Sequence, residues 1–168
     1  MKKEFPLIDG AKIKWKGSFD FAVLYRKLKD WLNAESYPDP TEDFYGERIK
    51  PTGKKNIEIV WSASKDEEDY FKHQVKVVFY GTDISDKEVV KDGKKLELKD
   101  GTIEMKISST LIIDANEKFG KGPNEPYKQK IYERYFVADN IEKNKIELYE
   151  KTLDLIEETK NFLNMYQF

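Results

Sequence analysis

The sequence predicts an α+β fold in which an antiparallel β-meander of about six to seven strands is covered on one face by an N-terminal helix and a long C-terminal helix. Apolar and polar residues alternate through most of the middle of the chain, two Asp-Gly pairs interrupt that alternation, and apolar residues recur every three or four positions near both ends. A length of 168 residues suits one domain with a full core. We therefore expect a single domain, 1–168, with 125–168 as its C-terminal helical segment.

A short strand and a helix are predicted near the N-terminus. Apolar residues alternate with lysines across Lys12–Lys16, which is a strand pattern, and the segment that follows changes to a helical period. Ser18 is a plausible N-cap, and Pro38 with Pro40 prevents the helix from continuing. The apolar face of this helix is formed by Phe21, Leu24, Tyr25, Leu28, Trp31 and Leu32.

The meander is predicted from period-two patterns and turn residues. An edge strand, Phe44–Lys50, is closed by a Pro-Thr-Gly turn, and the pairs Asp92-Gly93 and Asp100-Gly101 are typical of tight hairpin turns. We therefore expect separate short strands on either side of each Asp-Gly pair, with Thr102–Asp114 as the last. The inward-facing residues are Ile57, Ile59, Trp61 and Ala63, then Phe71, His73, Val75, Val77 and Phe79, then Ile103, Met105, Ile107, Ser109, Leu111 and Ile113.

The chain from about Tyr127 to Phe168 has a helical pattern. A single straight helix of that length would measure about 60 Å, roughly twice the width of a small domain. We therefore expect a break near residues 138–142 or self-association of a projecting helix. The apolar stripe that predicts this helix contains Ile131, Tyr135, Ala138, Ile141, Leu148, Tyr149, Thr152, Ile156, Thr159, Leu163 and Tyr166.

The order of elements, which is strand, helix, meander and long C-terminal helix, resembles that of the helix-grip, START-like superfamily. The resemblance lies in this order alone, and one helix follows the first strand here where that fold has two. It implies a curved antiparallel sheet wrapped around the C-terminal helix. It also implies a hydrophobic pocket between that helix and the sheet.

The only histidine, His73, follows an acidic run, Asp66–Asp69. The period-two pattern places the acidic run in a loop and the imidazole on the inward face of a strand, so the two point to different places. We expect a structural histidine, at least half buried beside Trp61 or Ile59. It should be hydrogen-bonded to a hydroxyl or a backbone carbonyl, with Ser109 and the C-terminal tyrosines as candidates. A contact to a ligand, or a role as metal ligand or catalytic base, remains an alternative.

Several classes of function are excluded or disfavoured. The absence of cysteine excludes disulfides, thiolate zinc sites and cysteine nucleophiles, and a lone histidine gives no basis for a metal site or a cofactor. No phosphate loop, Gly-x-Ser-x-Gly elbow or calcium-binding loop is present. Balanced charge, 30 basic against 32 acidic residues with arginine only at positions 26, 48 and 134, disfavours nucleic-acid binding. Without a signal peptide or membrane-spanning run, we expect a cytoplasmic protein.

Two functional hypotheses remain, and an enzyme is a distant third. The first is a non-catalytic protein-interaction or assembly module that uses the C-terminal helix to bind a protein partner or a second copy. The alternative is a carrier or sensor of a small apolar ligand, held in a pocket between the sheet and the C-terminal helix. The residues predicted to contact that ligand are Trp15, Trp61, His73 and Ser109. A closed core favours the first hypothesis, and a lined void of a few hundred cubic ångströms favours the second.

Overall fold

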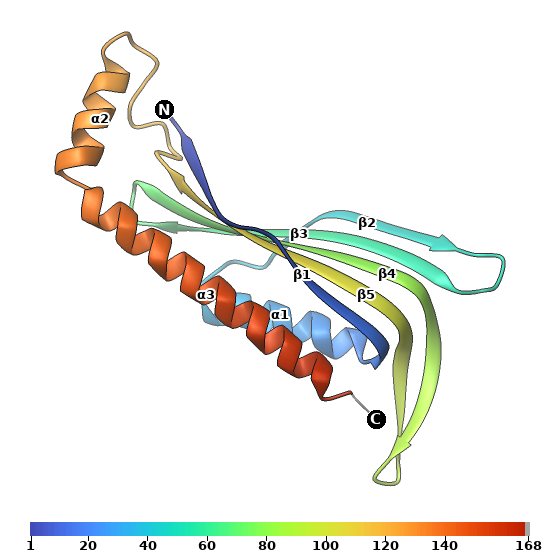
Figure 1. The fold of residues 1–168 in the computed structure, drawn as a ribbon. Helices are drawn as coiled ribbons and strands as arrows, with labels where there is room; N and C mark the ends of the chain where they lie inside the picture. The colour runs from blue at the N-terminus through green and yellow to red at the C-terminus, as the bar shows by residue number, and fades with distance from the viewer. Residues whose placement is uncertain (167–168) are drawn as a thin grey trace.

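The computed structural model describes residues 1–166 and confirms the α+β class (Figure 1). All strands pair antiparallel in one open sheet, and the last helix is long. The sheet has five strands, so the predicted number of six to seven is wrong. The elements in chain order are β1 (Lys3–Phe19), α1 (Phe21–Ala34), β2 (Thr41–Ile49), β3 (Lys55–Glu67), β4 (Phe71–Lys91), β5 (Lys94–Ile113), α2 (Glu125–Tyr135) and α3 (Ala138–Asn164).

The number of strands was overestimated because the two Asp-Gly pairs have different roles. Asp92 and Gly93 have positive φ values of 51° and 76° and form the hairpin turn between β4 and β5, as predicted. Asp100-Gly101 lies within β5 instead, opposite a shift in register of β4 between Thr82 and Ser85. A Cβ atom on Gly101 would lie 2.8 Å from a backbone oxygen of β4, so glycine permits this close approach.

The sheet order is β1-β5-β4-β3-β2, which leaves β1 and β2 at the two edges. Helix α1 carries the chain from one edge to the other. Its N-cap is Asp20, whose carboxylate accepts a hydrogen bond from the backbone N–H of Val23 at 3.1 Å. The prediction of Ser18 as N-cap is wrong, because Ser18 belongs to β1 and its hydroxyl donates to Asp100 at 3.1 Å.

Helices α1 and α3 lie on the same face of the curved sheet, as Figure 1 shows. α3 packs on β1 and β5, whereas α1 places aromatic rings over β3 and β4. The ring centroids of Tyr25 and Trp61, for example, are 4.1 Å apart in an edge-to-face arrangement. The predicted inward residues of β3, β4 and β5 are buried in this layer, apart from Ile57, which is partly exposed. The opposite face of the sheet carries no helix in the part of the chain that the structure describes.

The C-terminal segment is broken, but slightly earlier than predicted. α2 ends at Tyr135 and α3 begins at Ala138, so the break falls at Phe136 and Val137 rather than within residues 138–142. The predicted apolar stripe also divides between two faces of α3. Leu148 is buried against the sheet, whereas its neighbour Tyr149 is 45% exposed.

Candidate functional site

His73 is a buried, hydrogen-bonded residue on the face of the sheet that meets α3. Its side chain is 2% exposed, and its Nε2 lies 2.8 Å from Oδ1 of Asn144. The amide nitrogen of Asn144 donates to the carbonyl of Asn140 at 2.8 Å, so Oδ1 is the atom turned toward the imidazole. His73 is therefore the donor, with its proton on Nε2. Burial lowers the pKa of His73, while the bond to Asn144 and the charges of Glu67 and Glu147 act in the opposite direction.

The burial of His73 and its contact with the C-terminal helix confirm its predicted orientation, but its predicted neighbours are wrong. Lys65 and Leu111 lie opposite His73 on the adjacent strands, not Trp61 or Ile59. The reason is that β3 continues to Glu67, so the first two residues of the acidic run are in a strand rather than a loop. The missed partner, Asn144, occupies a position on the buried helical stripe, four residues before Leu148.

The other predicted contact residues do not surround a void. Trp61 and Ser109 are 2% and 1% exposed, and the buried hydroxyl of Ser109 has no hydrogen-bond partner within residues 1–166. Trp15 is partly exposed on β1, and its indole N–H donates to the carbonyl of Ser18 at 3.2 Å. Within the same described residues, no group of three or more histidine, aspartate and glutamate side chains could hold a metal ion.

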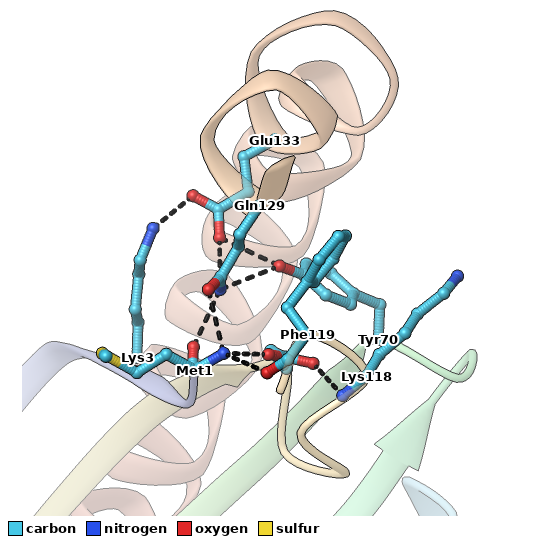
Figure 2. Close-up of polar contacts among 8 residues, drawn as sticks. Met1, Lys3, Tyr70, Lys118, Phe119, Gln129 and Glu133 are labelled. Carbon is cyan, nitrogen blue, oxygen red and sulfur yellow. Dashed lines mark hydrogen bonds and ion pairs between the residues drawn. The ribbon is translucent and has the colours of Figure 1, made fainter. Parts of the chain in front are cut away.

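A polar cluster joins α2 to the end of the sheet, as Figure 2 shows. The Met1 amino group donates to the buried carboxylate of Asp114 and, at 2.9 Å, to Oε1 of Gln129. The amide of Gln129 and the hydroxyl of Tyr70 each lie 2.9 Å from Glu133, whose other oxygen contacts Lys3. Burial and the neighbouring Glu133 raise the pKa of Tyr70. Each polar group in this cluster has a partner, so the cluster fixes the position of α2 and leaves no vacant ligand site.

An exposed apolar stripe follows α3 on the side next to β1. It consists of Ile146, Tyr149 and Leu153, which are 56%, 45% and 42% exposed; we call it the α3 stripe. The amino group of Lys145 lies 4.5 Å from the centre of the Phe5 ring on β1, and Tyr149 is one helical turn from Lys145. α1 packs against the other flank of α3. The α3 stripe is therefore turned away from α1, toward the edge of the sheet that β1 forms.

Hollows are also present elsewhere on the helix-covered face. An open hollow of about 710 Å³ lies between α1 and the edge formed by β2 and β3, where Phe21, Tyr25, Tyr45 and Ile59 contribute apolar surface. A groove of about 310 Å³ separates α1 from α3, and a cavity of about 30 Å³ lies in the core near Phe79. The four predicted contact residues, Trp15, Trp61, His73 and Ser109, line none of these three spaces.

Neither a scan against protein-family models nor searches among curated proteins and solved structures produced a match. None of the helices over residues 1–166 is long and apolar enough to cross a bilayer.

Proposed function

We propose that this protein is a non-catalytic interaction module that binds a partner protein along α3 and the adjacent edge strand β1. The α3 stripe carries the proposal. Three large apolar side chains at helical spacing are each more than two-fifths exposed, although other apolar residues of the same helix are almost fully buried. Aromatic and aliphatic residues grouped in this way are typical of the core of a protein interface.

The surroundings of the α3 stripe support a protein partner. β1 pairs with β5 on one side only, so its other side presents backbone N–H and C=O groups beside the α3 stripe. An apolar helix face next to an open strand offers both buried area and directional hydrogen bonds.

Photocrosslinking in cells of the source organism tests this proposal. A photoreactive phenylalanine analogue replaces Tyr149 in the full chain, and the matched control carries it at Asp154, an exposed residue on another flank of α3. We expect a discrete crosslinked partner from position 149 that is absent from position 154. Adding Ile146→Ser and Leu153→Ser to the 149 variant should abolish that product.

Three results would overturn the proposal. They are equal crosslinking from positions 149 and 154, no crosslinking from either position, and a product that consists only of two copies of this chain.

Binding of a small apolar ligand is the second candidate, and the open hollow beside α1 favours it. Its volume of about 710 Å³ lies within the usual range for ligand sites, and Tyr25 and Tyr45 could orient a ligand. The site would differ from the predicted one, which lay beneath the C-terminal helix. Native mass spectrometry of the purified protein would reveal a retained ligand, and Tyr25→Ala should release it.

A further inference from the structure

We propose that the free edge of β1, over Ala11–Gly17, accepts an extended segment of the partner as a sixth strand, and that acidic residues alternate with apolar ones in this segment. This inference rests on the proposed function, because it specifies the chemistry of the partner at the same site.

The part of the edge that can pair with an added strand is the second half of β1. Pairing with β5 is irregular between Pro6 and Ala11, where two register shifts occur, and proline and bulges at an edge oppose further pairing. From Ala11 to Phe19 the register with β5 is continuous. Every second residue of a regular antiparallel edge directs its N–H and C=O groups outward, so this half of β1 can form a new ladder. The indole N–H of Trp15 already donates a hydrogen bond to the carbonyl of Ser18, so that carbonyl is not free to pair with another strand. The segment that can pair therefore ends near Gly17.

The charge on the uncovered face of this segment specifies acidic partners. Lys12, Lys14 and Lys16 alternate along β1 and are all exposed. Lys12 lies 3.5 Å from Glu104, which is directly opposite Lys14 in the register with β5, and neither Lys14 nor Lys16 has a carboxylate within 4 Å in residues 1–166. In an antiparallel ladder, residues directly opposite each other share a face of the sheet, and opposite charges in such pairs are stabilising. A sixth strand would therefore bring acidic residues next to the lysine row.

The helix-covered face of the same segment specifies apolar partners. Ile13 is 4% exposed, while Trp15 is only partly covered and packs against the core. Residues of an added strand on this face would cover Trp15 and approach α3. The partner segment therefore alternates acidic and apolar side chains.

A second copy of this chain fits the edge less well. If two β1 strands paired antiparallel about a two-fold axis, the lysine rows would face each other, and like charges directly opposite are destabilising. Pairing with β2 of another copy in one continuous sheet would place the lysines opposite Phe44, Gly46 and Arg48, which include no carboxylate. If the sheet of that copy were inverted, the lysines would lie opposite Glu42 and Glu47. Glu42 already accepts a hydrogen bond from Tyr25, and Glu47 already forms an ion pair with Lys55.

Peptide binding tests the inference on the full chain. The probe is a fluorescent synthetic peptide of about nine residues in which glutamate alternates with valine, long enough to span Ala11–Gly17. One control peptide replaces each glutamate with lysine, and another retains the glutamates but carries N-methyl groups on alternate amides, so that it cannot form the ladder. We expect fluorescence anisotropy to show that the acidic peptide binds. Both control peptides should bind at least about tenfold more weakly than the acidic peptide does.

Variants of the protein locate the binding site. Lys14→Glu with Lys16→Glu should weaken binding of the acidic peptide by about tenfold or more and should favour the lysine peptide instead. The matched control is Lys72→Glu with Lys76→Glu, which changes the net charge of the protein by the same amount but on β4. It should bind the acidic peptide as tightly as the unmodified protein does. Hydrogen exchange should slow at alternate amides of Ala11–Gly17 when the acidic peptide is bound.

The outcomes separate this inference from the proposed function. Equal binding of the N-methylated and unmodified acidic peptides would overturn strand addition, because charge attraction alone would then be sufficient. No binding of any peptide would also overturn strand addition, even if crosslinking from Tyr149 identified a partner. Sedimentation that detects a dimer of this chain, lost in the Lys14→Glu and Lys16→Glu variant, would replace the acidic partner with a second copy.

Discussion

The two C-terminal helices are held to the sheet in different ways. α3 buries a row of apolar side chains that includes Leu148, Leu155 and Phe162. α2 buries only Gln129 and is positioned by the polar cluster and by the partly covered ring of Tyr132. A fully buried leucine or phenylalanine contributes about 1.5–3 kcal/mol, whereas a hydrogen bond contributes about 0.5–1.5 kcal/mol net. α3 should therefore unfold only with the whole domain, while α2 can open locally.

This difference explains where the chain can bind a partner without rearrangement. The buried row holds α3 firmly against β1 and β5, so the α3 stripe on its flank is a rigid, preorganised surface. α2 exposes Tyr127 and Tyr135, each at 70%, but lacks a comparable anchor. Rigid presentation lowers the entropic cost of binding, and α3 is therefore the better docking element.

The largest expected effect comes from removing an anchor of α3. Leu155→Ala should lower the free energy of unfolding by about 3 kcal/mol, because Leu155 is 1% exposed and a cavity would remain. Leu153→Ala, two residues away at 42% exposure, is the control and should change it by less than about 0.5 kcal/mol. Urea denaturation measures both. Similar values for the two variants would mean that α3 is not anchored by its buried row.

The second effect concerns the contact between α3 and the sheet at His73. Burial lowers the pKa of His73 in the folded chain below the ordinary value of 6.5, so the unfolded chain binds the proton first as the pH falls. The contribution to stability is therefore fully present above pH 6.5. It is lost below that pH with a slope of up to about 1.4 kcal/mol per pH unit.

Denaturation of the wild type and His73→Gln at several pH values between 5 and 8 checks this expectation. Because His73 is the only histidine, the difference between the two stability curves isolates its titration. The variant should lack the extra loss below pH 6.5. Parallel curves for the two proteins would show that His73 titrates alike in the folded and unfolded chains.

The smallest effect should come from a variant in α2. Gln129→Ala removes contacts to Met1, Tyr70 and Glu133, and it should speed hydrogen exchange of the α2 amides by about tenfold, or about 1.4 kcal/mol of local opening. The global free energy of unfolding should fall by a similar amount, because complete unfolding breaks the same contacts, whereas the exposed control Lys130→Ala should change it by less than about 0.5 kcal/mol. In the Gln129→Ala variant the α2 amides should still exchange faster than those of α3, and equal rates in the two helices would show that they unfold together.

The parts of the fold that depend on local patterns could be predicted from the sequence. The inward faces of β3, β4 and β5 follow from strict alternation of apolar and polar residues. Residues two positions apart in a strand lie on the same face of the sheet, and one face of this sheet is buried. The turn at Asp92-Gly93 likewise depends only on the conformations those two residues favour.

The features that the sequence did not reveal depend on distant pairing. Whether Asp100-Gly101 turns the chain or continues a strand is decided by the register of β4 opposite it. The pairing of His73 with Asn144 depends on how far α3 is displaced along the sheet. Periodicity also could not separate Tyr149 from the buried Leu148, because both are apolar and adjacent on the helix.

The position of β1 beside the last strand affects how the protein is made. Gly10 and Ser108, which are hydrogen-bonded across β1 and β5, lie 98 residues apart in the chain. At about 5–20 residues per second, the ribosome needs about 5–20 s after making β1 to supply its partner strand. During that interval both edges of β1 are unpaired, and its alternating lysines would protect the nascent chain from aggregation.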